Sequence, residues 1–480
     1  MRMNILGLEV STSSAKTIIY SSDNGVVDVQ SIPYPSEVCD VVSQDIEGMY
    51  GTLIECTKKI LKDNDLNIDA IGISTTWHSL LLLDSDKRPI GRLRTWADTE
   101  ASHTSKRYRE DTTLSSEFYK KTGCVIHSVY PIWKYMHIKA EDSATAEKAR
   151  YLSSQQEYIF ERLTGERAVS KTMASGTGFF NINTLDWDSD ILNFAGLDKR
   201  ALSPLVEPTY FAPLTEEAAR EMDLASGIPV VIGGSDGALN QIGAGAMEEG
   251  IMTLSVGTSG ALRLASKVPV IPQEPSTWCY YLADGKRIAG AATAGAGNCV
   301  EWFVKRLNSH SGLGFSELEA HMEAIDRAEA PIFLPFLYGE RCPGWNDERQ
   351  GGFYGLKGEH LIGDMYYSLL EGILFNLYHC YIILTEVMDI PKEIRISGGI
   401  TNSDIWLQMA ADIFQREIIT SQIEHASIIG GVALALNAMG ELESLDEFSS
   451  PMGERIEPNR DMAGHYRRRF EKYLKLYERI

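Results

Sequence analysis

The sequence predicts an α/β protein built from two related halves. In each half apolar strands come first and then alternate with amphipathic helices, an order typical of α/β sheets. At 480 residues the chain is longer than one hydrophobic core normally supports. A phrase of eight residues also occurs twice, at 8–15 and 254–261, with the shared pattern Leu-x-Val-[Ser/Gly]-Thr-Ser-x-Ala. We therefore expect two domains, residues 1–245 and 246–480.

Each copy of the phrase joins an apolar strand, 5–10 or 251–256, to a turn rich in hydroxyl groups. Such turns can present backbone N–H groups and hydroxyls to an anion such as phosphate. Two copies in separate halves predict a duplicated fold that grips one polyphosphate from both sides. The alternative is two unrelated Ser/Gly hairpins that are alike by chance.

The first half opens with strands at 4–10 and 17–20, followed by an Asn24-Gly25 hairpin turn. A continuous apolar face predicts a helix over 45–64. Strands at 70–74 and 80–83 follow, separated by a polar patch that contains Trp77 and His78. This pair fits a sugar-binding platform, although His78 also fits a core histidine. Residues 100–225 are richer in helix and loop and are interpreted as an insertion that carries substrate contacts.

The second half is expected to restart with the strand at Ile251 and to end in several helices. A strand at 393–397 and a Gly-Gly turn precede a helix at 403–414. The next helix, 428–439, is rich in small residues, which permits the close helix contact that a hinge needs and equally permits ordinary packing. The charged C-terminal helix, 463–479, is interpreted as having a solvated Arg/Lys face.

The strongest single motif is the apolar strand that ends in Gly233-Gly234-Ser235-Asp236-Gly237. Phosphoryl transfer to a hydroxyl requires a carboxylate that orients the nucleophile and accepts its proton. Asp236 is placed for that role, just before the second copy of the repeated phrase. A plain Asp-Gly turn is the structural alternative. At the end of the first strand, Glu9 could bind Mg²⁺ and Lys16 could reach a phosphate.

Composition excludes several other classes of protein. The balance of 45 basic and 66 acidic residues gives a net charge of −21, which disfavours binding to nucleic acid or to an anionic membrane. Seven scattered cysteines without CxxC spacing indicate reduced thiols and a cytoplasmic setting. No signal peptide and no 18-residue apolar segment is evident. P-loop, GxGxxG and HExxH motifs are also missing.

Taken in order, these phrases resemble the FGGY carbohydrate kinases, relatives of hexokinase and actin. Two further blocks carry the resemblance: the run from Leu334 to Pro343, similar to FLPYLxGERxP, and the run from Gly351 to Glu371, which departs from the family signature only at Leu369. The resemblance implies two ribonuclease-H-like domains with a cleft between them. It also implies a sugar kinase that uses ATP and Mg²⁺, with a small-molecule sugar or sugar acid as its partner and a homodimer as a candidate assembly.

The resemblance also assigns roles to residues. Asp236 matches the general base and, with Glu9, the metal site, while Trp77 and His78 match the pair that contacts the sugar. The first phosphate loop corresponds to Thr12, Ser13, Ser14 and Lys16, the second to Gly257 and Thr258, and the remaining nucleotide contacts to Gly297, Glu301, Gly399 and Ser403.

Within the family, gluconokinases are the most similar, on the blocks at 95–99, 371–378 and 405–414. The expected reaction is phosphorylation of gluconate to 6-phosphogluconate, with xylulose or another pentulose or polyol as the alternative substrate. Glu9 replaces the usual Asp, Ser11 the usual Gly and Glu100 the usual Arg. These departures motivate a second hypothesis, which concerns another class of protein. The chain would then be a nucleotide-binding scaffold or regulator with weakened catalysis.

Overall fold

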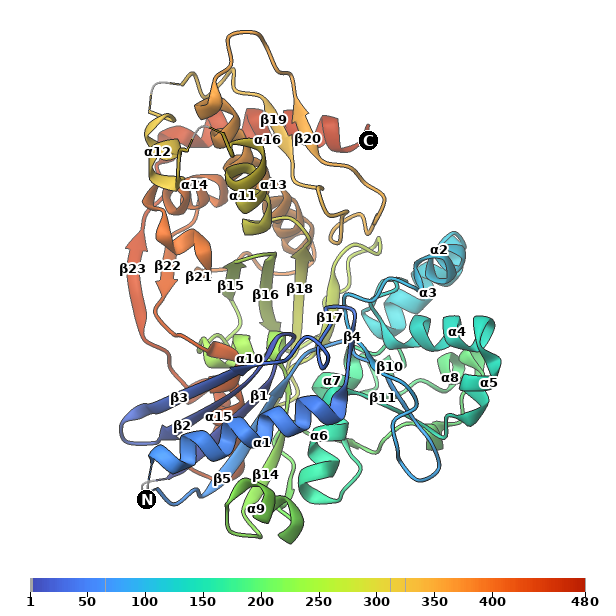
Figure 1. Ribbon diagram of the computed structural model, residues 1–480. Coiled ribbons are helices and arrows are strands. Elements are labelled where there is room, and N and C mark those ends of the chain that lie inside the picture. The colour runs from blue at the N-terminus through green and yellow to red at the C-terminus, as the bar shows by residue number, and fades with distance from the viewer. Residues whose placement is uncertain (1–2, 65, 311, 324, 480) are drawn as a thin grey trace.

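The computed structural model describes residues 3–64, 66–310, 312–323 and 325–479. Its two large sheets have matching topology (Figure 1). The first has the order β13-β14-β5-β1-β2-β3 and the second the order β17-β18-β16-β15-β21-β22-β23. In each, an antiparallel meander is followed by two parallel strands and an antiparallel edge strand. The second sheet adds β17 beyond its meander, so the prediction of a duplicated fold is confirmed.

The strands of the two sheets come from separate parts of the chain. The first sheet contains β1 (Asn4–Val10), β2 (Ser14–Ser21), β3 (Gly25–Pro33), β5 (Ala70–Thr75), β13 (Phe211–Pro213) and β14 (Pro229–Ser235). The second contains β15 (Ile251–Val256), β16 (Gly260–Ser266), β17 (Trp278–Tyr281), β18 (Arg287–Thr293), β21 (Glu393–Ser397), β22 (Ile418–Ser421) and β23 (Met452–Ile456).

Helix α1 (Ile46–Asp63) forms where the apolar pattern predicts it and packs against β2 and β3. Its first turn is capped by the Asp45 carboxylate, which accepts a hydrogen bond from the Glu47 amide. One face of the helix buries Met49, Leu53 and Ile60 in the core of the first half. The local sequence therefore sets both the start of the helix and its orientation.

The small-residue helix α15 (Ala426–Ala438) belongs to the second half of the chain but packs on β1, β5 and β14 of the first sheet. It also crosses α10 (Asp236–Gly243), and glycines set the distance between the two helices. A Cβ atom on Gly430 would lie 2.0 Å from the Leu239 carbonyl oxygen. A Cβ atom on Gly243 would lie 1.9 Å from the Ala426 carbonyl oxygen. The small residues therefore serve a close contact at the junction of the halves.

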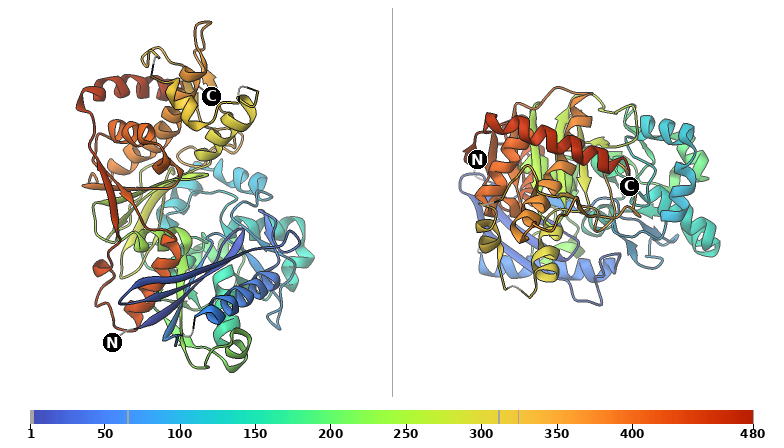
Figure 2. Two further views of the ribbon diagram at one scale, coloured as in Figure 1. Left: turned by 60° about the vertical axis from the view of Figure 1, so that its left-hand side comes forward. Right: turned by 90° about the horizontal axis from the view of Figure 1, so that it is seen from above.

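Helices dominate the stretch from residue 100 to 225, as predicted. The helices within 102–148 and 189–195 extend from the body beside the first sheet, whereas those at 155–164 and 216–222 pack in the core of the first half with α1 (Figures 1 and 2). The helices of this stretch are α2 (Ser102–Arg109), α3 (Thr112–Thr122), α4 (Pro131–Glu141), α5 (Ser143–Lys148), α6 (Gln155–Thr164), α7 (Lys171–Ser175), α8 (Ser189–Ala195) and α9 (Glu216–Met222). Below we call residues 100–225 the insertion.

Two features of the second half differ from the sequence predictions: an apolar window of 18 residues, where none was expected, and a buried arginine in the C-terminal helix. Helix α13 (Ile362–Thr385) is, among the described residues, the one helix long and apolar enough to cross a membrane, but 72% of its most apolar window is buried inside the protein. It packs against α14 (Asp404–Phe414) and α16 (Ala463–Tyr477). The prediction of a fully solvated Arg/Lys face on α16 is wrong at Arg469, which is 2% exposed and forms a buried ion pair with Glu371 of α13. All seven cysteines are free thiols.

Candidate active site

The two copies of the repeated phrase form corresponding hairpin turns. The first joins β1 to β2 and the second joins β15 to β16, and the strands that enter both turns are buried. In the first turn the Ser11 hydroxyl donates to the Ser14 carbonyl oxygen over 2.8 Å. Ser13, Thr258 and Ser259 are exposed at the tips. Thr12 and Ser259 line one cavity, so the two turns border a common space.

This cavity, of about 230 Å³, lies between the two halves and is called the sugar cavity below. From the first half it is lined by Thr12, Trp77, His78, Trp96, Asp236 and Gly237, and from the second by Ser259, Arg263, Trp278, Tyr280, Ala292 and Arg341. No described residue of the insertion is part of this lining, so the prediction that the insertion carries substrate contacts is wrong for the cavity. Instead, backbone carbonyl groups of the insertion form hydrogen bonds with two side chains that line the cavity, Trp77 and His78.

Asp236 is the first residue of α10 and follows directly after the buried strand β14. Its Oδ1 atom accepts a hydrogen bond of 2.7 Å from the Gly237 amide, and the side chain lines the sugar cavity. Burial and, to a smaller extent, the charge of Glu9 raise the pKa of Asp236 to about 6. A carboxylate with this pKa is ionised at neutral pH and is a stronger base than an exposed aspartate.

Trp77 and His78 follow β5 and are fixed by the insertion. The Trp77 indole N–H donates to the Thr172 carbonyl oxygen over 3.1 Å, and His78 Nδ1 lies 2.8 Å from the Gly176 carbonyl oxygen. Since a carbonyl only accepts, Nδ1 of His78 carries the proton. Burial lowers the pKa of His78 to about 3, so the ring is neutral and Nε2 is an acceptor. An acceptor in this place suits a sugar hydroxyl.

Aromatic side chains from both halves form one wall of the cavity. The rings of Trp278 and Tyr280 are stacked, with centroids 4.7 Å apart and an angle of 7° between their planes. Trp77 meets Tyr280 edge-on at 4.8 Å. Such faces pack against the C–H groups of a sugar while their polar edges remain available for hydrogen bonds. Neither Trp278 nor Tyr280 was predicted from the sequence, because nothing in the strand β17 distinguishes them from core residues.

Two arginines in the cavity were also missed. Arg263 lies within the otherwise apolar strand β16, and its Nε and Nη1 atoms are buried without a hydrogen-bond partner among the described residues. Burial lowers the pKa of Arg263 to about 10. Arg341 comes from the GERCP block, which was recognised as a family motif without a role for the arginine. A lone arginine in a buried strand was the available signal, since a buried cation requires a partner.

Glu9 is 5% exposed and its carboxylate is held by three side chains. Lys16 Nζ lies 3.2 Å from Oε2, and the Ser74 hydroxyl lies 3.5 Å from Oε1. The third contact is a short hydrogen bond from the Ser427 hydroxyl at the start of α15. Lys16 is thus paired with Glu9, and Glu9 links the first hydroxyl-rich turn to the helix at the junction of the halves.

Three glycine-containing segments meet behind the second turn. The Gly297 amide donates to the Gly257 carbonyl oxygen over 2.8 Å, and the Asn298 amide donates to the Thr258 carbonyl oxygen over 3.0 Å. Gly398 has a φ of +95°, and a Cβ atom there would lie 2.5 Å from the Val256 carbonyl oxygen. Gly399 follows it, and Ser403 caps α14 by accepting from the Trp406 amide. Glu301, in α11 (Gly297–Trp302), is exposed and paired with Lys305.

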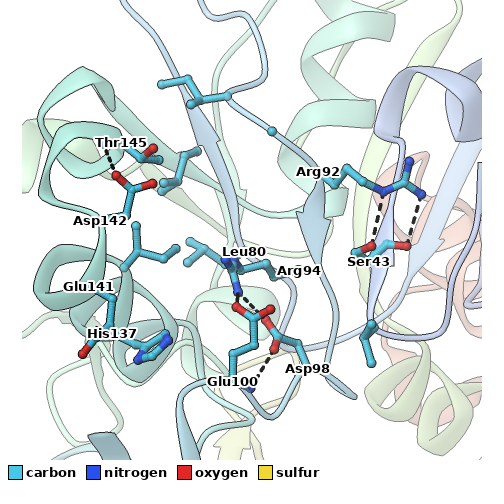
Figure 3. Close-up of a pocket in the computed structure, with 15 residues that line it drawn as sticks. Ser43, Leu80, Arg92, Arg94, Asp98, Glu100, His137, Glu141, Asp142 and Thr145 are labelled. Atoms are coloured by element: carbon cyan, nitrogen blue, oxygen red, sulfur yellow. Dashed lines mark hydrogen bonds and ion pairs between the residues drawn. The ribbon is translucent and has the colours of Figure 1, made fainter.

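A second cavity of about 590 Å³ is lined by residues of the first half and contains Glu100 (Figure 3). In it Arg94 donates to both Asp98 and Glu100, and Arg92 binds Ser43. The polar groups of this second cavity therefore largely satisfy one another. Glu100, the residue that stands in place of the family's arginine, is not among the residues that line the sugar cavity.

The two duplicated sheets, with a cavity between them that holds a carboxylate and borders two hydroxyl-rich turns, have the arrangement of the actin and hexokinase superfamily, which includes the sugar kinases. The family models for the N-terminal and C-terminal domains of the FGGY family of carbohydrate kinases match residues 4–243 and 252–439. The chain therefore belongs to the FGGY family of carbohydrate kinases. It is an enzyme that uses ATP to phosphorylate a small carbohydrate substrate.

Several relatives are similar over almost their whole length. The gluconokinase of Bacillus subtilis (strain 168) is 32% identical over 97% of this chain and 94% of its own length. The crystal structure of gluconate kinase from Lactobacillus acidophilus matches with a TM-score of 0.95 at 28% identity, covering 100% of this chain and 98% of that one. The ligand-bound xylulose kinase from the same organism also gives a TM-score of 0.95 at 28% identity, covering 99% and 98%.

Proposed function

We propose that this kinase transfers the γ-phosphoryl group of ATP to the terminal hydroxyl of a sugar acid, with gluconate as the first candidate and 6-phosphogluconate as the product. One observation carries the proposal: the sugar cavity combines Asp236 with the guanidinium groups of Arg263 and Arg341. A substrate carboxylate in the cavity would pair with the guanidinium groups of Arg263 and Arg341 that line it. The similarity to proteins named gluconokinase supports the same substrate.

In the proposed reaction Asp236 accepts the proton of the terminal hydroxyl as that oxygen forms its bond to the γ-phosphorus. The bond from the γ-phosphorus to the bridging oxygen breaks, and ADP leaves with the electron pair of that bond. His78 accepts a hydrogen bond from another substrate hydroxyl and orients the chain, while Trp77 and Tyr280 exclude water. The raised pKa of Asp236 suits this proton transfer near neutral pH.

The phosphates of ATP are proposed to lie between the two hydroxyl-rich turns. Thr12, Ser13, Ser14 and Lys16 would contact them from the first half, and Gly257 and Thr258 from the second. Gly297, Glu301, Gly399 and Ser403 would face the nucleoside. The network behind the second turn supports this assignment, because its glycines bring three backbone segments together.

Glu9 and Asp236 fit a Mg²⁺ ion in the type and number of their donors, since Mg²⁺ in such sites takes one or two carboxylates together with phosphate oxygens. When bound, Mg²⁺ supplies neutralisation of the negative charge on the phosphate oxygens. Both oxygens of Glu9 already accept hydrogen bonds from protein side chains. Because Glu9 is engaged in this way, Asp236 would be the main carboxylate to hold the ion, and Glu9 would add its negative charge.

Xylulose is the second candidate substrate, because the ligand-bound xylulose kinase structure is as similar in fold and identity as the gluconate kinase structure. The test is sugar-dependent ADP release by the purified protein with gluconate, xylulose, ribulose and glycerol. We expect gluconate to have the highest kcat/KM. A preference for xylulose would replace the proposed substrate, and ATP binding without turnover of any sugar would favour a scaffold.

The remaining assignments concern the setting of the enzyme. We propose a cytoplasmic location, and the net charge of −21 supports a protein without nucleic-acid partners. We place the boundary of the two domains at residues 245 and 246. The division of the strands between the two sheets supports that boundary.

A further inference from the structure

Residues 340–348, called the bridging loop below, carry Arg341 into the sugar cavity. The loop is closed on itself by two backbone hydrogen bonds. The Glu340 amide donates to the Asn346 carbonyl oxygen over 2.9 Å, and the Trp345 amide donates to the Arg341 carbonyl oxygen over 2.6 Å. These two bonds join the start of the loop, which carries Arg341, to the residues just before Asp347. The backbone positions of Arg341 and Asp347 are therefore coupled.

On one side the bridging loop is anchored to the second half of the chain. Glu340 accepts a hydrogen bond of 2.6 Å from the Tyr477 hydroxyl of α16. The Trp345 side chain is 1% exposed, and its indole N–H donates to the Ser276 carbonyl oxygen over 2.7 Å. The Cys342 amide, next to Arg341, also donates to the Ala292 carbonyl oxygen of β18 over 3.0 Å, so the second half holds the backbone beside Arg341 as well as the base of the loop.

On the other side the loop is anchored to the insertion of the first half. His127 Nε2 lies 3.0 Å from Asp347 Oδ1, and the Ser102 hydroxyl donates to Oδ2 over 3.3 Å. The Val129 amide donates to Nδ1 of His127, so Nε2 carries the proton and donates to Asp347. The Arg109 guanidinium adds a hydrogen bond of 2.6 Å to the Trp345 carbonyl oxygen. Asp347 therefore receives two hydrogen bonds from across the junction of the halves.

The Arg341 guanidinium itself has no hydrogen bond or ion pair to any side chain within the described residues. An unpaired arginine side chain keeps its rotamer freedom whether or not its backbone is fixed, and losing that freedom on binding weakens affinity. Fixing the loop from both sides removes only the backbone part of this cost, and it sets the region of the cavity that the guanidinium group can reach.

We propose that Asp347 is a positioning residue for substrate specificity, which through the bridging loop holds Arg341 against the carboxylate of an anionic sugar. The inference rests on the proposed function, because it requires a sugar acid in the cavity. It predicts that loss of the Asp347 contacts weakens the binding of acidic substrates and leaves neutral ones unaffected.

The experiment compares gluconate with glucitol, which has a hydroxymethyl group in place of the carboxylate. For Asp347→Ala we expect the KM for gluconate to rise about tenfold, with kcat and the KM for ATP within about twofold of wild type. The inhibition constant of glucitol should not change. Asp347→Asn keeps an oxygen acceptor for His127 and should restore most of the affinity. Arg341→Met should raise the KM for gluconate about 100-fold, and adding Asp347→Ala to it should have little further effect.

Glu348→Gln is the matched control, since it breaks the exposed ion pair between Lys106 and Glu348 in the same loop. It should leave all constants unchanged. Ser102→Ala removes one of the two bonds to Asp347 and tests the same idea, with a rise of about threefold in the gluconate KM, if Asp347→Ala does not fold.

Three results would overturn the inference, and they are distinguishable. If Asp347→Ala lowers the affinity for gluconate and for glucitol equally, or raises the KM for ATP, the loop only joins the halves. Gluconate turnover by the wild type with an unchanged KM in Asp347→Ala would defeat the inference and leave the proposed function standing. Absence of turnover with any sugar acid by the wild type would defeat both.

Discussion

The two hydroxyl-rich turns join corresponding strands but differ in length and in chemistry. Residues 11–14 separate the paired Val10 and Ala15, whereas only residues 257–259 separate the paired Val256 and Gly260. In the first, Glu9 and Lys16 face each other across β1 and β2 and form an ion pair. At the corresponding place in the second turn, Ser255 faces Ala261. The second turn instead has Gly257, whose carbonyl oxygen is bound by the Gly297 amide. The charge is confined to one copy and the glycine contacts to the other.

This difference indicates how a duplicated scaffold becomes an asymmetric site. A charged turn beside Asp236 is suited to proton transfer and to a cation, whereas an uncharged glycine turn lets the backbone approach phosphate closely. Both turns border the sugar cavity. The division of roles between them can be tested by changing one turn at a time.

The largest expected effect is at Asp236, beside the charged first turn. Asp236→Asn removes the proposed base, and we expect kcat to fall about 1000-fold. Sugar-dependent ADP release measures this loss, while the affinity for ATP should be retained. Asp223→Asn, an exposed substitution at the end of α9, should be fully active. Activity of Asp236→Asn near the wild-type level would remove the asymmetry that we propose.

The second prediction concerns pH. The pKa of Asp236 is raised to about 6, so the carboxylate becomes protonated as the pH falls through that value and can no longer accept a proton. We expect kcat/KM to fall about tenfold for each pH unit below about 6. In Glu9→Gln the negative charge that raises the pKa of Asp236 is gone, so the acid limb of the profile should move to lower pH. If the acid limb of the kcat/KM profile stays at the same pH in Glu9→Gln, Glu9 does not influence the pKa of Asp236.

The third prediction tests the uncharged second turn, which contains Gly257. A Cβ atom at Gly257 would have no atom within 4 Å, so Gly257→Ala should fold normally. A methyl group would nevertheless stand between the backbone and a phosphate, and we expect the KM for ATP to rise about tenfold. Gly51→Ala in α1 also has open space and serves as the control. An unchanged KM for ATP in Gly257→Ala would place the phosphates elsewhere.

The smallest effect is expected at the link between the first turn and α15. Ser427→Ala removes the donor of one hydrogen bond to Glu9, whereas Glu9→Asp withdraws the carboxylate from Ser427 and also changes its contacts with Lys16 and Ser74. We expect each to lower kcat/KM about fivefold, and the double variant to lose little more because both changes break the same contact. Additive losses measured in this cycle would show that the two residues act independently.

Much of the fold was predictable because it depends on local patterns. The apolar period set α1 within one residue at each end, and Asn24-Gly25 predicted the turn between β2 and β3. The repeated phrase predicted both hairpins and, through them, the duplicated sheet. A strand that ends in Asp-Gly predicted where Asp236 lies, since a strand end and the helix that follows it are decided by neighbouring residues.

The parts that escaped prediction depend on contacts between distant residues. Arg469 looked like a member of a solvated face until α13 supplied Glu371, 98 residues away in sequence. Arg263 and Tyr280 resembled ordinary strand residues, and only the meeting of the halves turned them toward a cavity. The membrane-length apolar character of α13 was also resolved by its packing.

The sequence by itself determined the two-domain α/β architecture, the kinase family and the position of Asp236, the proposed base, because these depend on short-range periodicity and on motifs of adjacent residues. The tertiary structure decided which side chains share the site. Glu9 meets Ser427 across 418 residues of sequence, and Asp347 meets His127 across 220. Such pairings follow from how the sheets and helices pack against each other, which local propensity does not specify.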